Sequence, residues 1–157
     1  MPDRDVEDLK NLAGRIRNLN AKIKLISLLE KARDEFDQTK HSDCQKTCKE
    51  ILKINPLNPT ALRGLGCVMQ AQNNLKKALE YYFKALDFSQ NKEIEYTLIG
   101  TIYYIEENLD EAIKFFNLAI DCNGDYDPAY EGRNQSMLEN HLKIADLQDR
   151  LIKQKIF

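Results

Sequence analysis

Residues of one kind recur every 34 positions through the middle of this chain, and this period constrains the fold more than any other feature. The pairs that share the spacing are Gly66 and Gly100, Leu75 and Leu109, Ala78 and Ala112, and Ala85 and Ala119. Continued backwards, the same step leads from Gly66 to Ala32 and from Leu86 to Leu52, so that three units cover residues 25–126. Repetition at this length is typical of a stack in which each unit buries its apolar face against its neighbours. We therefore expect function to lie on an extended surface.

Small residues stand inside each unit where two helices need to approach closely. They occupy positions 8, 20 and 27, with one exception at Ile51: Ala32, Gly66 and Gly100; Cys44, Ala78 and Ala112; Ile51, Ala85 and Ala119. Helix starts are indicated by Asn58-Pro59, Asp127-Pro128, Asn108 with Glu111, and Ser42 with Gln45. The first two place a proline after an N-cap, and the last two resemble capping boxes. Almost no strand pattern remains, so we predict an all-α fold.

These positions resemble the tetratricopeptide repeat, whose pattern is a large residue, Leu-Gly, Tyr, Ala, Phe, Ala and Pro. The second unit carries Leu62, Leu65-Gly66, Met69, Leu75, Ala78, Tyr82 and Ala85. The third carries Tyr96, Ile99-Gly100, Tyr103, Leu109, Ala112, Phe116 and Ala119. The first is a weaker match, with Leu28, Lys31-Ala32, Glu35, Cys44, Cys48, Ile51 and a closing Pro56. The resemblance implies a superhelix of stacked antiparallel helix pairs, with an N-terminal amphipathic helix (1–24), three repeats (25–58, 59–92 and 93–126) and a C-terminal capping helix (127–157).

The resemblance also implies which residues face the concave groove, because the first helix of each unit lines it in this family. The residues in the groove-facing positions are Ile26, Leu29, Arg33, Phe36 and Asp37; Thr60, Arg63, Cys67, Gln70 and Ala71; and Ile94, Thr97, Thr101, Tyr104 and Ile105. We expect a peptide-binding groove formed by Leu29, Arg33, Arg63, Cys67, Gln70, Thr97, Thr101 and Tyr104. The alternative is that some of these side chains pack against the flanking helices. Replacement of Arg63 and Tyr104 is expected to weaken partner binding and to leave melting nearly unchanged.

The expected ligand is an extended or helical segment with apolar anchors and an acidic group near Arg33 and Arg63. One subclass of the family grips the acidic tail of heat-shock chaperones with lysine, asparagine and arginine side chains. The corresponding positions here hold Leu29, Arg33, Gly64, Ile94 and Leu98. We therefore do not predict that partner.

Apolar residues spaced three and four apart precede the first unit, at Leu9, Leu12, Ile16, Leu19, Ile23 and Ile26. This heptad pattern leaves three interpretations open: a cap folded onto the array, a dimer seam through Leu9, Leu12, Ile16, Leu19 and Ile23, or a helix laid in the groove of a neighbouring copy. At the other end, the residues expected to close the array are Ala129, Tyr130, Met137, Leu138 and Leu142. The apolar stripe beyond them, from Ile144 to Ile156, indicates contact with another chain or a helix folded back on the array.

Several functional classes are disfavoured by composition and motif content. The net charge of −2 gives no attraction to nucleic acid or to anionic membranes, and no apolar run approaches the length of a membrane helix. Because His41, Cys44 and Cys48 lack a fourth ligand nearby, we expect no metal site and no cofactor. No phosphate-binding loop, nucleophile motif or catalytic carboxylate pair is present, so we expect no enzymatic activity. The first residues lack the order of a secretory signal, which predicts a cytoplasmic protein.

Two functional classes remain. The favoured one is a non-catalytic protein–protein interaction module or scaffold that binds a peptide or helix of a partner in its concave groove and self-associates, as a homodimer, through its terminal helices. The alternative is a secretion-type chaperone that holds an extended hydrophobic client segment. The layout of an N-terminal helical region, three repeats and a C-terminal helix is similar to that of type III secretion translocator chaperones.

Overall fold

The computed structural model describes residues 2–155, with side-chain surroundings for residues 6–152. The helices are α1 (Pro2–Asp37), α2 (His41–Ile54), α3 (Pro59–Ala71), α4 (Leu75–Phe88), α5 (Lys92–Ile105), α6 (Leu109–Cys122) and α7 (Asp127–Lys155). No strand occurs within residues 2–155, which confirms the predicted all-α fold. None of these helices combines the length and the apolar character needed to cross a membrane.

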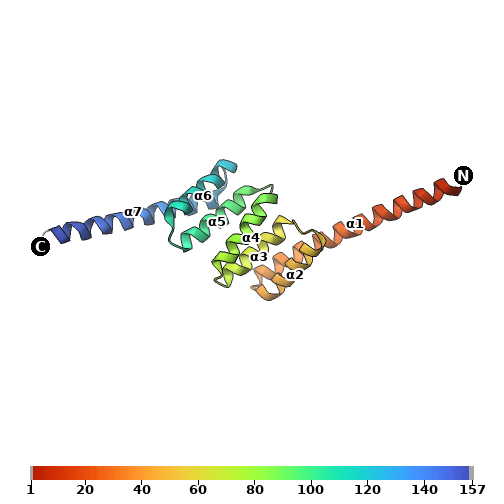
Figure 1. The fold of residues 1–157 in the computed structure, drawn as a ribbon, viewed down its shortest axis with the longest axis horizontal. Helices are drawn as coiled ribbons and strands as arrows, with labels where there is room; N and C mark the ends of the chain where they lie inside the picture. Colours follow the sequence, from red (N-terminus) through yellow and green to blue (C-terminus); the bar gives the residue numbers. More distant parts are fainter. Residues whose placement is uncertain (1, 156–157) are drawn as a thin grey trace.

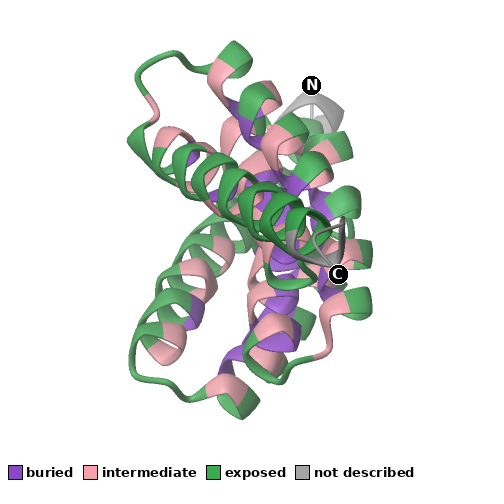
Figure 2. Ribbon diagram, turned by 90° about the vertical axis from the view of Figure 1, so that its left-hand side faces the viewer, coloured by how far each residue is buried: buried purple, intermediate pink, exposed green. Residues whose placement is uncertain are grey.

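The helices pack as consecutive pairs that form an array (Figure 1). Helix α1 packs on α2, α3 on α4 and α5 on α6, each pair contacts the next, and α7 packs on α6 and α5. The buried residues gather along the inner sides of these helices (Figure 2). Helix α1 passes without a break through residue 24, so the predicted N-terminal helix and the first helix of the first unit are one element. The division of the chain into segments stays a prediction.

The structure has helices at the predicted starts, but the side-chain caps predicted there are only partly present. Asn58 caps α3 as predicted, because its side chain accepts a hydrogen bond from the backbone N–H of Ala61 at 2.9 Å. The two capping boxes are wrong. Helix α2 already begins at His41, which places Ser42 inside its first turn, and Asn108 precedes α6 without a side-chain capping hydrogen bond.

Each helix pair turns through a residue in the left-handed region of backbone space. These residues are Thr39, Asn73 and Glu107, with φ of 59°, 58° and 59°, and they again stand 34 apart. The following N–H donates to a carbonyl five residues earlier, as in Lys40 N to Glu35 O at 2.8 Å and Asn108 N to Tyr103 O at 2.9 Å. This arrangement is a Schellman motif, which satisfies helix-terminal carbonyls through the backbone alone. The motif ends the first helix of each pair, and at Asn73 it coexists with a side-chain cap of the next helix, in which Asn74 Oδ1 accepts from Lys77 N at 3.3 Å.

In the second and third helix pairs, a buried aromatic ring packs directly against the backbone of a glycine. A Cβ added to Gly66 would overlap the ring of Tyr82, and one added to Gly132 would overlap the ring of Phe116. A Cβ at Gly100 would lie only 3.0 Å from Phe116. Both rings are at most 2% exposed. The small residues predicted at close helix contacts therefore do allow close packing.

The first half of α1 projects away from the array (Figure 1). Its apolar residues Leu9, Leu12, Ile16, Leu19, Ile23 and Ile26 are all between 51% and 65% exposed. The interpretation that this segment caps the array is therefore wrong. Helix α1 contains no internal proline, so nothing breaks it where the array begins, and it continues outward in one direction.

The C-terminal helix caps the array with fewer residues than predicted. Ala129 and Ser136 are fully buried, and Ser136 Oγ donates to Gly132 O at 2.7 Å. Met137, Leu138 and Leu142 were expected to close the array but are at least 40% exposed. The rest of α7 points away from the array on the side opposite to α1, so it is not folded back (Figure 1). Ile156 of the predicted stripe lies outside the described residues.

We predict that Gly66→Leu destabilises the fold. The added side chain must displace the buried ring of Tyr82, which costs about 1–3 kcal/mol as overpacking. The matched control is Gly14→Leu, because nothing lies within 4 Å of a Cβ at Gly14. Chemical denaturation followed by circular dichroism compares the two, and equal stability of both variants would contradict the close approach.

Candidate functional site

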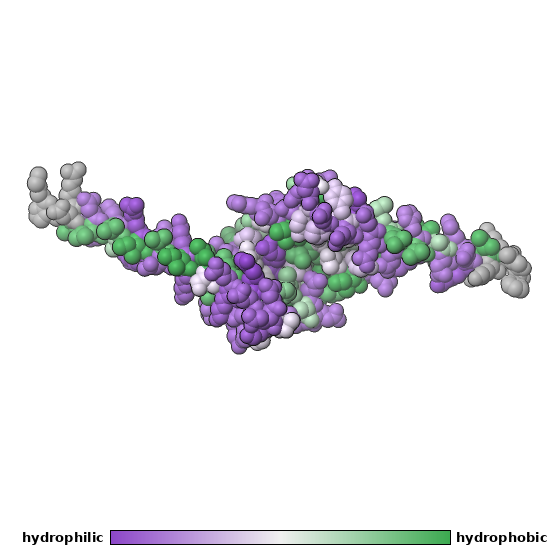
Figure 3. Space-filling view, turned by 180° about the vertical axis from the view of Figure 1, so that it is seen from behind, coloured by the Kyte–Doolittle hydropathy of each residue, from purple (hydrophilic) through white to green (hydrophobic). Residues whose placement is uncertain are grey.

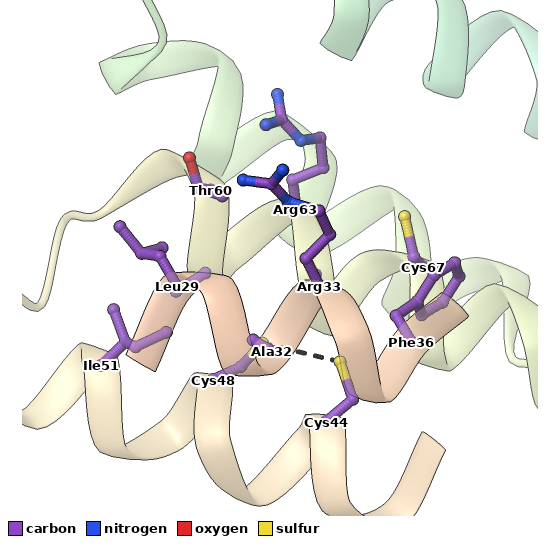
Figure 4. Close-up of a pocket in the computed structure, with 12 residues that line it drawn as sticks. Leu29, Ala32, Arg33, Phe36, Cys44, Cys48, Ile51, Thr60, Arg63 and Cys67 are labelled. Carbon is purple, nitrogen blue, oxygen red and sulfur yellow. Dashed lines mark hydrogen bonds between the residues drawn. The ribbon is translucent and has the colours of Figure 1, made fainter. Parts of the chain in front are cut away.

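A cavity of about 490 Å³ opens between α1, α2 and α3 (Figure 4). Its lining residues are Leu29, Ala32, Arg33, Phe36, Cys44, Cys48, Ile51, Thr60, Ala61, Arg63, Gly64 and Cys67. Six of these were predicted to face the groove: Leu29, Arg33, Phe36, Thr60, Arg63 and Cys67. The volume is within the range of sites that bind ligands in proteins.

The floor of the cavity consists of buried residues, most of which the repeat pattern had placed at packing positions. Ala32, Cys44, Cys48, Ile51 and Ala61 are at most 8% exposed. Ala32, Cys44, Cys48 and Ile51 were missed as site residues because their positions in the unit are packing positions. The available signal was Cys48, which stands where the later units have the rings of Tyr82 and Phe116.

Three thiols belong to this cavity, and all are free. Cys44 Sγ and Cys48 Sγ lie 4.0 Å apart. Burial raises the pKa of Cys48 to about 12, and burial also raises the pKa of Cys44 and of Cys67. At neutral pH these groups are therefore uncharged thiols, which are weak nucleophiles and weak metal ligands. Among the described residues, no three or more His, Cys, Asp or Glu side chains are grouped to hold a metal ion.

Arg63 at the mouth of the cavity is paired with a buried carboxylate. Its Nη1 donates to Glu95 Oε1 at 3.0 Å, and this contact joins α3 to α5. The Glu95 side chain is fully buried, whereas that of Arg63 is 24% exposed. Arg63 is therefore part of the fold as well as of the cavity. This ion pair argues against the expectation that replacement of Arg63 leaves melting unchanged, because the change would leave the Glu95 carboxylate buried without its cation.

Arg33 provides the second guanidinium group at the mouth of the cavity. It is exposed and has no ion-pair partner among residues 6–152. Its guanidinium and that of Arg63 point to the same side of the cavity, toward which Leu29 and the Thr60 hydroxyl also point (Figure 4). The site thus combines an apolar, thiol-containing floor with a basic mouth.

Among the comparisons with known proteins, the comparison with solved structures finds matches. No protein-family model matches the chain, and no curated protein matches it in sequence. The first TPR domain of human RPAP3 matches with a TM-score of 0.69 at 16% identity, over 77% of this chain and 95% of that domain. Pseudomonas aeruginosa pilF gives a TM-score of 0.70 at 17% identity, over 78% of this chain and 56% of that one. The chain has the tetratricopeptide-repeat fold.

A larger protein contains the same fold. A Thermobaculum terrenum O-GlcNAc transferase mutant matches with a TM-score of 0.70 at 19% identity, over 74% of this chain. The match spans only 22% of the transferase. At these identities the likeness establishes the tetratricopeptide-repeat architecture and no activity.

The other predicted groove residues of this tetratricopeptide-repeat array do not line the cavity. Gln70 Oε1 accepts from the Tyr82 hydroxyl at 2.8 Å, and Tyr104 Oη accepts from Gln135 Nε2 at 3.0 Å. These two side chains contact neighbouring helices, which was the stated alternative. The hydroxyls of Thr97 and Thr101 donate to carbonyls of their own helix at 2.8 and 2.9 Å. A hydrogen bond with the Glu139 carboxylate is the main cause that raises the pKa of Tyr104.

We predict that Arg63→Met lowers the free energy of unfolding by roughly 3 kcal/mol, because the Glu95 carboxylate stays buried without its partner. The double variant Arg63→Met/Glu95→Met should recover most of this loss, since two apolar side chains can replace a buried pair. Arg33→Met is the control, and its effect should stay within about 0.5 kcal/mol. Urea denaturation of the four proteins measures these differences. An Arg63→Met protein as stable as the wild type would show that the ion pair does not support the fold.

Proposed function

We propose that this chain is a non-catalytic protein–protein interaction module that binds a segment of a partner protein at the cavity and along the groove beside it. The observation that carries the proposal is the convergence of six predicted groove residues, from two units, on one cavity. A floor of apolar and thiol side chains suits an apolar anchor, and exposed Arg33 suits an acidic group of the ligand.

A structural neighbour supports this proposal at the level of the fold. The first TPR domain of Spaghetti (RPAP3), bound to an HSP90 peptide, matches with a TM-score of 0.67 at 15% identity, over 74% of this chain and 93% of that one. That ligand belongs to the neighbour. In this chain Leu29, Gly64 and Ile94 occupy positions where the subclass that grips the acidic tail of heat-shock chaperones has lysine or asparagine. We propose a different peptide as the ligand of this chain.

Selection from a displayed random peptide library tests the proposed function on the full chain. We predict that the selected peptides bind the wild type with micromolar or better affinity in fluorescence anisotropy, and that Arg33→Glu weakens them at least about tenfold, or 1.4 kcal/mol. Lys49→Glu is the matched control, because it makes the same charge change at an exposed position of α2. If no peptide is selected, or if both variants lose affinity equally, binding at this site is excluded. The chaperone alternative stays a prediction, since no described feature distinguishes it from peptide binding.

We also propose that a second copy of the chain covers the apolar stripe of α1. This stripe consists of Leu9, Leu12, Ile16, Leu19 and Ile23, and it follows one side of the projecting helix (Figure 3). In heptad terms Ile16 and Ile23 fall at a positions, and Leu12 and Leu19 at d positions. Isoleucine at a with leucine at d favours two parallel strands. The proposed assembly is therefore a parallel homodimer through α1.

We predict that Ile16→Asn/Leu19→Asn converts this dimer to a monomer. Each of these side chains contributes about 1.5–3 kcal/mol when buried, and both copies lose two, so dimerisation should weaken at least 100-fold. Ala21→Gln/Lys24→Gln is the control, because these positions lie outside the a and d seam. Light scattering coupled to gel filtration measures the mass. A wild type that is monomeric at several hundred micromolar would refute the dimer.

A further inference from the structure

The first unit lacks the buried ring that fills the centre of the other two. Tyr82 and Phe116 are at most 2% exposed and lie against the bare backbone of Gly66 and Gly100. The residue 34 positions before Tyr82 is Cys48, which is 1% exposed. A thiol thus occupies the place of an aromatic side chain, and the cavity opens beside it.

The walls around Cys48 retain features that accommodate a ring. Gly64 presents bare backbone, since a Cβ there would lie 2.8 Å from Cys48 Sγ. Phe36 supplies an aromatic wall and is itself held at 5.5 Å, between ring centroids, from His41. The side chains that line an unfilled apolar cavity lack dispersion contacts on that side. An aromatic ring inserted from another molecule would make these contacts with the cavity walls.

The two arginine side chains at the mouth of the cavity favour a ligand that carries a negative charge. The guanidinium of Arg63 is already engaged by Glu95, whereas Arg33 has no ion-pair partner among the described residues. Guanidinium groups favour carboxylates, which they can bind through two parallel hydrogen bonds. Since both guanidinium groups point to the same side of the cavity (Figure 4), a carboxylate bound to Arg33 would lie close to an aromatic group inserted into the cavity.

We infer that the cavity takes the aromatic side chain of a partner peptide while a neighbouring aspartate or glutamate of that peptide pairs with Arg33. This inference rests on the proposed function and names the ligand class of the same site. The chain supplies a ring to its second and third units from within, and its first unit receives one from the partner.

The test fills the cavity from within. Ala32→Gly/Cys48→Phe copies into the first unit the pairing of Gly100 with Phe116. The matched control is Cys122→Phe at an exposed thiol. Against peptides selected on the wild-type chain, the filled variant should bind at least about tenfold more weakly and the control unchanged. Replacement of the aromatic residue in the peptide by alanine should weaken binding to the wild type by a similar factor, and should have little effect on the filled variant.

Two results overturn the inference and leave the proposed function standing: selected peptides without an aromatic residue, or a filled variant that binds them within twofold of the wild type. If no peptide is selected at all, the proposed function fails first. Should the filled variant not fold, the wild type still provides a test. Saturating aromatic-acidic peptide should slow iodoacetamide labelling of Cys67, which lines the cavity, at least about fivefold, with exposed Cys122 unaffected. Unchanged labelling of Cys67 overturns the inference.

Discussion

The close approach of a ring to a helix backbone that carries no Cβ determines how this array is built. Tyr82 packs against Gly66, and Phe116 packs against Gly100 and Gly132, so that helices of successive units approach closely. The turn between the paired helices does not depend on this contact, since it also occurs at Thr39 in the first unit, which has no such ring. Where the ring is missing, at Cys48, the structure contains a cavity. The contact between a buried ring and a glycine backbone, which repeats in the second and third units, is therefore missing from the first unit, where the cavity lies.

The 34-residue period was sufficient to predict the helix pairs, because its small residues mark contacts that depend on local sequence and neighbouring units. It was insufficient for the helix ends. The capping boxes expected at Ser42 and Asn108 do not form, because α2 begins before Ser42 and the Asn108 side chain makes no capping hydrogen bond. The Schellman turn before each of these helices uses Thr39 or Glu107 in a left-handed conformation that neither residue type favours, so composition carries no signal for it.

The sequence predicted several residues that line the candidate site, but it did not predict the ion pair at the mouth of the cavity. The repeat positions identified Leu29, Arg33 and Cys67 as neighbours because the stacking of units is regular. The pairing of Arg63 with Glu95 was missed, since it joins residues 32 apart on helices of different units and leaves no periodic trace. The placement of α1 was left open among three interpretations, because an apolar stripe looks the same in sequence whether the chain or a partner covers it.

Helix α1 carries both the apolar stripe and one wall of the cavity. Ile23 at the end of the stripe precedes Leu29 in the cavity by six residues, about 9 Å along a continuous helix. Any assembly that pairs the stripes would thereby hold two binding sites on stiff arms at a set separation. A partner with two suitable segments would engage both, and its apparent affinity would then depend on the distance between those segments as well as on their sequence.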